Sequence, residues 1–343
     1  MVKASERRRF GRSDLEVTAL GFGAATIGNL FRPIPEETAQ GMLDTAWDAG
    51  VRVFDTAPSY GNAVSEYRVG SNLRNRQPRS EYIVSTKMGY LLKPADPATA
   101  VNESWVAPGA FRTEYDYSYD GAMRSVEDSL QRMGVQYLDV VYVHDTDPFM
   151  MPGFWREKFE EALDPNTGAS KALIEMRDQG VISGWGFGIN HWEPCHEALQ
   201  RADLDCFLLA GRYTMLDTDT LDDFLPLCVE RDVAIMLGGG FNGGILATGD
   251  VPGAKYQYAP APEEIRARVR GIQSVCDRHE VPLPAAALQF PIAHPAVPTI
   301  IPGGRTVEQF QGSIDLIEFP IPADFWAELK AEGHIREDAP TPA

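Results

Sequence analysis

Four polar side chains follow short apolar segments of the chain, and their types suit proton transfer: Asp55, Tyr60, Lys87 and His144. They supply a carboxylate, a phenol, an amine and an imidazole, which can move a proton to or from an oxygen atom. A tyrosine alone is a poor proton donor at neutral pH because its ordinary pKa is about 10, but a neighbouring ammonium group lowers that pKa. We therefore expect Lys87 to lower the pKa of Tyr60 and Asp55 to hold Lys87 in its charged form. His144 would orient the reacting oxygen.

Each of these residues also has an ordinary structural explanation when it is taken alone. An aspartate can cap a helix, a tyrosine or histidine can be a hydrogen-bonded core residue, and a lysine can be a solvated charge. The catalytic interpretation therefore depends on the elements that carry the four residues and on whether those elements bring them together.

The sequence predicts a repeated alternation of short strands and amphipathic helices. Apolar segments rich in β-branched residues alternate with longer segments of helical periodicity, several of which end at a glycine. The predicted strands cover residues 17–22, 51–55, 82–86, 138–143, 185–189, 206–210, 234–237 and 299–301. Eight such units favour a single α/β domain over residues 1–343, folded as a closed (β/α)8 TIM barrel. The strand ends of a barrel meet on one face, which would bring the four side chains together.

Segments outside this alternation are expected at the two ends of the barrel. Residues 9–13 are typical of the turn of an N-terminal β-hairpin, which would cover the bottom of the barrel. Long insertions at 90–119, 145–168 and 241–261 follow strands, so these loops should shape a substrate pocket on the catalytic face. The polar, proline-containing tail 337–343 is expected to be mobile. Aromatic residues that could line the pocket, or only pack the loops, are Trp105, Phe111, Tyr115, Phe149, Phe154 and Trp155.

Composition excludes several classes of function. With 31 basic and 49 acidic residues the formal charge is −18, which repels polyanions and argues against a nucleic-acid partner. No signal peptide and no run of about 18 apolar residues occurs, so we expect a cytoplasmic protein without a membrane partner. The four cysteines lack C-x-x-C spacing and indicate buried thiols rather than a disulfide framework. His191, Cys195 and His196 have no fourth ligand at a suitable spacing, so no metal site is expected.

The motifs around the four residues resemble those of the aldo-keto reductases. They recur in order over nearly the whole chain as Phe54-Asp55-Thr56-Ala57-Pro58-Ser59-Tyr60-Gly61, Ser85-Thr86-Lys87, Tyr142-Val143-His144-Asp145 and Gly188-Ile189-Asn190. The resemblance implies a barrel enzyme that uses a nicotinamide cofactor. It also implies that Tyr60 transfers the proton and that Asp55, Lys87 and His144 complete the catalytic group.

The same resemblance implies where the nicotinamide is held. Gly188 and Asn190 match the family segment that binds the carboxamide, whereas Ala210 stands where glutamine is usual and Gly238 replaces a stacking aromatic residue. The glycine-rich segment after the seventh strand is not a Rossmann motif, because it lies late in the chain and precedes a loop. Its backbone is instead expected to approach the cofactor closely. The contacts expected from this segment are Gly238, Gly239, Asn242 and Gly243.

The segment after the eighth strand is expected to meet the phosphates of the cofactor. Thr306 and Gln309 have capping-box spacing, so a helix with free backbone N–H groups should begin here. Relatives that prefer NADPH place a lysine and an arginine where this chain has Gly303 and Gln309. We therefore expect NAD rather than NADP, although Arg305 could still reach a 2′-phosphate. The contacts expected here are Ile301, Gly303, Arg305 and Gln309.

The departures at the sixth and seventh strands resemble a subgroup of the family that contains aldose 1-dehydrogenases, L-fucose dehydrogenases and pyridoxal 4-dehydrogenase. This resemblance implies a small-molecule substrate and NAD-dependent oxidation of the anomeric hydroxyl of an aldose, of the L-fucose or D-threo-aldose type, to a lactone. The same residues could instead form 4-pyridoxolactone from pyridoxal, or reduce carbonyl compounds. A cofactor-sensing regulatory subunit is the alternative outside the enzymes. The loops carry no motif that selects a substrate, and the sequence does not indicate an oligomeric state.

Overall fold

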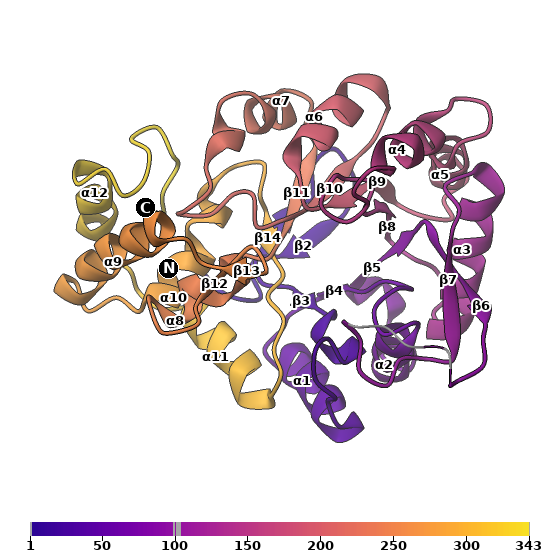
Figure 1. The fold of residues 1–343 in the computed structure, drawn as a ribbon, viewed down its shortest axis with the longest axis horizontal. Coiled ribbons are helices and arrows are strands. Elements are labelled where there is room, and N and C mark those ends of the chain that lie inside the picture. The colour runs from indigo at the N-terminus through magenta and orange to yellow at the C-terminus, as the bar shows by residue number, and fades with distance from the viewer. Residues whose placement is uncertain (1, 99, 101–103, 343) are drawn as a thin grey trace.

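The computed structural model in Figure 1 describes residues 2–98, 100 and 104–342, and its centre is a parallel barrel. Eight parallel strands form one sheet in the order β3-β4-β5-β8-β9-β10-β11-β14. Gly21 N–H donates to the carbonyl of Ile300 (2.8 Å) and Ile300 N–H donates to that of Ala19 (3.1 Å), which joins the first strand to the last. The predicted (β/α)8 TIM barrel is therefore confirmed. The strands are β3 (Phe22–Gly23), β4 (Val53–Asp55), β5 (Ile83–Met88), β8 (Val140–His144), β9 (Gly184–Ile189), β10 (Cys206–Ala210), β11 (Ala234–Gly238) and β14 (Thr299–Ile300).

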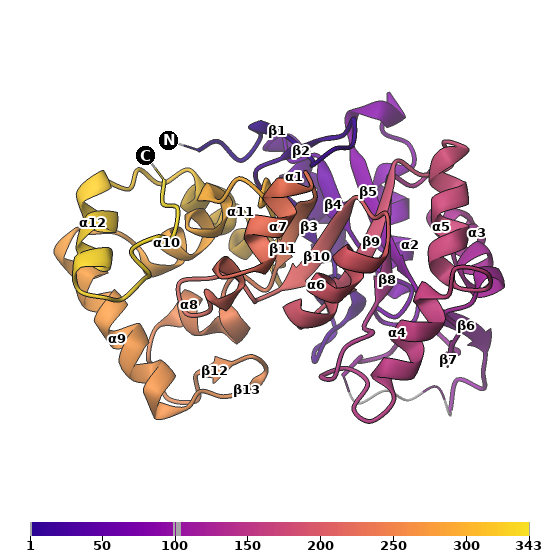
Figure 2. The same ribbon diagram turned by 90° about the horizontal axis from the view of Figure 1, so that it is seen from above.

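Helices surround this barrel in both views (Figures 1 and 2). Their ends follow the local chemistry: Ser118 caps α3 by accepting from Gly121 N–H, and Gly134 ends it with φ 66°. The helices are α1 (Glu36–Asp48), α2 (Val64–Leu73), α3 (Tyr119–Met133), α4 (Trp155–Leu163), α5 (Ala169–Asp178), α6 (Trp192–Arg201), α7 (Phe224–Glu230), α8 (Ile245–Thr248), α9 (Glu263–Arg278), α10 (Leu283–Gln289), α11 (Val307–Ile317) and α12 (Ala323–Ala331). Short 3₁₀ helices lie at Thr26–Gly28, Arg79–Glu81, Asp219–Leu221, Asn242–Gly244 and Pro291–Ala293.

The predicted first strand is only partly right. Its first half belongs to β2 (Glu16–Thr18), which pairs with β1 (Arg7–Arg9) in the antiparallel N-terminal hairpin. Val17 of this hairpin packs with Phe10 against side chains inside the barrel, among them Val140. The hairpin thus closes one end of the barrel, as expected. The apolar run 17–22 looked continuous because both the hairpin and β3 bury their side chains.

The long insertions lie at the other end of the barrel (Figure 2). The insertion after β5 forms a hairpin of β6 (Tyr90–Pro94) and β7 (Phe111–Tyr115), and the insertion after β11 contains β12 (Lys255–Tyr256) and β13 (Ala259–Pro260). The insertion after β8 contains α4. Since all three follow strands, they surround the carboxyl ends of the barrel strands, where the expected pocket should lie.

The C-terminal residues pack on the rest of the protein as far as Ala339. Ala339 is fully buried, and Arg336 forms ion pairs with Asp222 (2.6 Å) and Asp338 (2.7 Å). Mobility of the tail 337–343 and a single domain over 1–343 stay predictions.

The structure also places the cysteines and the apolar helices. Cys195, Cys206, Cys228 and Cys276 are all buried, free thiols. Among residues 2–98, 100 and 104–342, the helices are too short or too polar to cross a membrane.

Candidate active site

The four predicted catalytic residues converge at the carboxyl ends of neighbouring strands. Asp55 ends β4, Lys87 lies in β5, His144 ends β8 and Tyr60 lies in the turn after β4. These strands are adjacent in the sheet, so their side chains reach the same space. The ring centroids of Tyr60 and His144 are 5.8 Å apart, and Lys87 Nζ lies 4.6 Å from the centroid of the Tyr60 ring. The structure thus brings all four together, while their catalytic roles stay a prediction.

Lys87 is fixed by a buried ion pair. Its Nζ donates to Asp55 Oδ2 (2.7 Å) and to the carbonyl of Thr56 (2.7 Å), and Ser85 Oγ donates to the other Asp55 oxygen (2.7 Å). The side chains of Lys87 and Asp55 are 1% and 3% exposed. Burial raises the pKa of Asp55, while the charge of Lys87 opposes this rise. A buried pair needs such hydrogen bonds to offset the loss of hydration, so the amine has one defined position.

The pKa of Tyr60 differs from the prediction made from the sequence. Burial raises the pKa of Tyr60 well above 10, and the carboxylates of Asp55 and Asp145 raise it further. The expectation that Lys87 lowers this pKa is wrong for the protein alone. Asp55 largely neutralises the Lys87 charge, and Nζ lies over the face of the Tyr60 ring while donating its hydrogen bonds elsewhere. Tyr60 is therefore a neutral phenol, the form that donates a proton to a carbonyl oxygen.

His144 is a neutral imidazole. Burial lowers the pKa of His144 well below 6.5, and the charge of Lys87 lowers it further. The Nδ1 atom is 3.5 Å from Ser59 Oγ, and Nε2 is 3.4 Å from Asp145 Oδ1. Tyr117 OH donates to the His144 carbonyl (2.6 Å), which fixes the end of β8. A neutral imidazole can donate one hydrogen bond to a reacting oxygen, as the predicted role requires.

These residues open into a cavity of about 440 Å³. Three of the six aromatic residues proposed from the insertions line it, namely Trp105, Tyr115 and Phe149. The others pack the loops: Phe154 lies against Tyr115 with ring centroids 5.6 Å apart, Trp155 lies against Phe159 at 6.1 Å, and Phe111 begins β7. Lining residues that sequence reasoning missed include Ser59, Asn62, Tyr90, Asp145 and Tyr258. Ser59 and Asp145 stand inside the recognised motifs and could have been found there, whereas the insertions gave no signal for the others.

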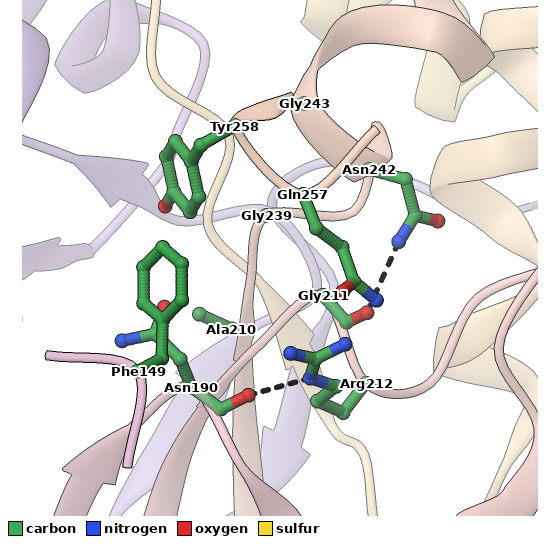
Figure 3. A pocket seen from close by; sticks show the side chains of 10 residues that line it. All are labelled: Phe149, Asn190, Ala210, Gly211, Arg212, Gly239, Asn242, Gly243, Gln257 and Tyr258. Atoms are coloured by element: carbon green, nitrogen blue, oxygen red, sulfur yellow. Dashed lines mark hydrogen bonds between the residues drawn. The ribbon is translucent and has the colours of Figure 1, made fainter. Parts of the chain in front are cut away.

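A narrow pocket of about 30 Å³ adjoins the cavity at the ends of β9, β10 and β11 (Figure 3). Phe149 and Tyr258 stack beside it, with ring centroids 5.6 Å apart and an interplanar angle of 22°. The loops after β8 and β11 therefore meet at this point. The pocket is lined by Phe149, Asn190, Ala210, Gly211, Arg212, Gly239, Asn242, Gly243, Gln257 and Tyr258.

Comparison with known proteins agrees with this geometry. The sequence profile of the aldo/keto reductase family matches residues 19–332. The chain belongs to the aldo/keto reductase family. It is 42% identical to the pyridoxal 4-dehydrogenase of Microbacterium luteolum, over 97% of this chain and 99% of that protein. It is 36% identical to the D-threo-aldose 1-dehydrogenase of a Pseudomonas species, over 96% of each chain.

A solved structure confirms the fold. The holo form of an aldo-keto reductase from Bacillus halodurans has a TM-score of 0.71 at 24% identity, covering 98% of this chain and 97% of that chain. The chain is thus an aldo/keto reductase, a nicotinamide-dependent oxidoreductase, and the family resemblance read from its motifs is confirmed.

Some of the predicted cofactor residues of this aldo/keto reductase line one of the two cavities, and the others do not. Gly188 and Asn190 line the large cavity, and Asn190, Gly239, Asn242 and Gly243 line the narrow pocket. The Asn242 amide donates to the Gly211 carbonyl (3.1 Å) and accepts from Thr214, so its side chain ties two loops together. The predicted residues that lie outside the lining of both cavities are Gly238, Ile301, Gly303, Arg305 and Gln309.

The narrow pocket combines an open glycine backbone with a cationic side chain. Gly239 and Gly243 have φ of 63° and 77°, and a Cβ on Gly239 would lie 3.0 Å from the nitrogen of Gly211. Only glycine leaves the backbone this open. Arg212 adds a cation to the pocket and donates to the carbonyl of Asn190 (2.5 Å). A guanidinium suits a phosphate group, which carries negative charge and accepts hydrogen bonds.

Two backbone N–H groups at the start of α11, those of Arg305 and Gln309, are engaged within the protein. Thr306 caps the helix by accepting from Gln309 N–H (3.2 Å), as its spacing predicts. Gln309 Oε1 accepts from Arg305 N–H (2.9 Å), and Arg305 Nη1 donates to the Leu30 carbonyl (2.9 Å). Burial lowers the pKa of Arg305, and the nearby charge of Arg32 lowers it further.

Proposed function

We propose that this aldo/keto reductase oxidises a cyclic hemiacetal to a lactone, with NAD as the electron acceptor. The observation that carries the proposal is the convergence of Tyr60, His144 and Lys87 on the wall of the 440 Å³ cavity, with Asp55 holding Lys87 from behind in a buried ion pair. The nicotinamide, when bound, takes the hydride from the carbon that bears the hydroxyl group. The protein then has to remove the hydroxyl proton and hold the oxygen in place.

Tyr60 and His144 divide this work in the proposed reaction. The hydroxyl O–H bond and the adjacent C–H bond break as a second C–O bond forms, and the proton passes to Tyr60 while His144 donates a hydrogen bond to the oxygen. To accept that proton Tyr60 must first be a phenolate, a form that burial and the carboxylates of Asp55 and Asp145 disfavour in the protein alone. Lys87 Nζ, 4.6 Å from the centroid of the ring, is the cation beside it. In the opposite direction the neutral phenol donates the proton.

An aldose is the first candidate substrate. One relative, 36% identical to this chain, is a D-threo-aldose 1-dehydrogenase. The cavity wall also offers three hydrogen-bonding side chains, Ser59, Asn62 and Asp145, which suit a substrate with several hydroxyl groups.

Pyridoxal is the second candidate, since its cyclic form is also a hemiacetal. The relative with 42% identity is a pyridoxal 4-dehydrogenase. The aromatic rings of Tyr90, Trp105 and Tyr115 on the cavity wall suit a flat heteroaromatic substrate.

We propose NAD as the preferred cofactor because the start of α11 lacks the lysine and arginine expected for a 2′-phosphate. Gln309 is occupied in the helix cap, and one Arg305 nitrogen is bonded to the Leu30 carbonyl. These contacts leave little freedom for either side chain to reorganise around an added phosphate.

The test is reduction of NAD and, separately, NADP by the purified protein with D-arabinose, L-fucose or pyridoxal, followed as absorbance of the reduced nicotinamide. Mass spectrometry should find a product two hydrogens lighter than the substrate. Reduction of aldehydes by NADH or NADPH without oxidation of any hemiacetal would overturn the proposed direction. Cofactor binding without turnover in either direction would favour a cofactor-sensing subunit.

A further inference from the structure

Asp145 has an unusual position directly after His144. It is 6% exposed and lines the 440 Å³ cavity. Its φ is 58°, in the left-handed region that residues other than glycine seldom adopt. Its N–H donates to the carbonyl of Gly188 (3.1 Å), which holds this conformation against β9. Backbone conformations of this kind are concentrated at functional sites, so the side chain needs an explanation.

The protein uses only part of the hydrogen-bonding capacity of this carboxylate. Tyr90 OH donates to Asp145 Oδ2 (2.7 Å) and thereby fixes the side chain. The other oxygen, Oδ1, is 3.4 Å from His144 Nε2, which is longer than a good N–H···O bond. An ionised carboxylate offers about four acceptor sites. Asp145 therefore has acceptor capacity left on the side that faces His144 and the cavity.

Asp145 Oδ1, the oxygen with free acceptor capacity, lies close to the place that the reacting oxygen would occupy. In the proposed reaction His144 Nε2 donates to the substrate oxygen at about 3 Å, and hydroxyl groups on adjacent carbons are separated by a similar length of about 3 Å. Because Oδ1 is 3.4 Å from Nε2, a hydroxyl group next to the reacting carbon can lie within hydrogen-bond distance of Oδ1. The four atoms are His144 Nε2, the reacting oxygen, the oxygen of the neighbouring hydroxyl group and Asp145 Oδ1. They lie at the corners of a quadrilateral with sides of nearly equal length.

We infer that Asp145 is a substrate-binding residue that accepts a hydrogen bond from the hydroxyl group beside the reacting carbon. In an aldose this is the hydroxyl on C2. In pyridoxal the nearest counterpart is the hydroxyl on ring C3, which is one carbon further from the reacting carbon. The inference rests on the proposed function. It makes Asp145 a determinant of specificity: a substrate without this hydroxyl leaves a buried acceptor unpaired and reacts more slowly.

The electrostatic setting agrees with this role. Burial raises the pKa of Asp145 to about 7, while the Tyr90 hydroxyl opposes the rise. A hydroxyl donor from the substrate favours the ionised carboxylate over the neutral acid, so binding and ionisation support each other.

The test combines an enzyme variant with a substrate that lacks the hydroxyl. Asp145→Asn keeps the shape, and the Tyr90 hydroxyl needs the remaining oxygen as its acceptor, so the amide NH₂ group faces the substrate. We expect this variant to lower kcat/KM for D-arabinose by at least about 10-fold, and for 2-deoxy-D-arabinose by less than about 3-fold. If pyridoxal is the substrate, pyridoxal and 3-deoxypyridoxal form the corresponding pair.

A wild-type measurement tests the same inference without any variant. The wild-type protein should prefer D-arabinose over 2-deoxy-D-arabinose by at least about 10-fold in kcat/KM. Tyr90→Phe, assayed at a pH well above 7 so that Asp145 stays ionised, is the matched control. It removes the support of the carboxylate but not the acceptor, so we expect it to lower kcat/KM for both sugars by the same factor.

Two failures can be told apart. If wild type oxidises these hemiacetals but Asp145→Asn lowers kcat/KM equally for a substrate and its deoxy counterpart, Asp145 only positions His144 and the inference is overturned. If wild type oxidises neither the sugars nor pyridoxal, the proposed function fails and the inference fails with it.

Discussion

Replacement of Lys87 by methionine tests the buried ion pair through stability. Lys87→Met keeps an unbranched side chain, one atom shorter, and removes the charge and two hydrogen bonds of 2.7 Å. Asp55 then remains 2% exposed with Ser85 as its side-chain partner. Removing one partner of a buried pair typically costs about 3–5 kcal/mol, because the other charge is left uncompensated. At about pH 8, where Asp55 of the wild-type protein is ionised, we expect the free energy of unfolding of Lys87→Met to be lower than that of wild type by this amount.

The pH dependence of this loss has a definite sign. Burial raises the pKa of Asp55 and Lys87 opposes the rise, so without Lys87 the folded-state pKa lies higher still. The folded variant therefore binds a proton over a window in which the unfolded chain has lost it, from the unfolded pKa of about 4 upward. Stability falls as pH rises through that window. The difference between wild type and Lys87→Met should accordingly be smaller at about pH 5 than at about pH 8.

Urea unfolding followed by tryptophan fluorescence measures both effects. The matched control is the double variant Lys87→Met/Asp55→Asn, in which no uncompensated carboxylate remains, so part of the lost stability should return. A loss below about 1 kcal/mol for Lys87→Met at high pH would refute the reasoning, and so would a loss that Asp55→Asn does not reduce.

Two further predictions concern activity. The kcat/KM for a hydroxylated hemiacetal should rise as pH increases through about 7, because the pKa of Asp145 is about 7 and its carboxylate accepts the substrate hydroxyl, and this inflection should disappear in Asp145→Asn. If Asp145→Asn shows the same inflection, the inflection belongs to another titratable group near Asp145. These groups are His144, Lys87, Asp147, Tyr60, Tyr90, Tyr115, Tyr117 and Tyr258. The kcat/KM for NAD should exceed that for NADP by at least about 10-fold, because Arg305 and Gln309 are held by the contacts at the start of α11 and do not meet a 2′-phosphate. A wild-type preference for NADP would contradict the proposed cofactor.

The barrel and the convergence of the catalytic group could be predicted because both follow from local patterns. Eight alternations of strand and helix determine a barrel, and residues at strand ends must then share one face. Asp55, Lys87 and His144 each lie at or near such an end. The first strand was misjudged for a tertiary reason: the apolar side chains of the hairpin and of β3 are both buried, although only β3 belongs to the barrel sheet.

The chemistry of the site was harder to predict because it depends on several elements at once. The pKa of Tyr60 is set by burial and by the carboxylates of Asp55 and Asp145, and no sequence spacing gives the balance between these effects and the charge of Lys87. The segment that contains Asn242 lies beside the narrow pocket. The side-chain amide of Asn242, however, is hydrogen-bonded to Gly211 and Thr214 and so joins two loops. The roles of Tyr90 and Tyr258 depend on how the insertions fold over the barrel.

Hydride transfer from the hemiacetal carbon tests the central claim most directly. The substrate is an aldose or pyridoxal that carries deuterium on that carbon, and the measurement is deuterium in the reduced nicotinamide during a single turnover by wild type and by Tyr60→Phe. We expect wild type to transfer the deuterium, and the variant to do so at least about 100-fold more slowly while its Kd for NAD changes by less than about 2-fold. Transfer at an undiminished rate in Tyr60→Phe, or a reduced nicotinamide free of deuterium in wild type, would contradict the account.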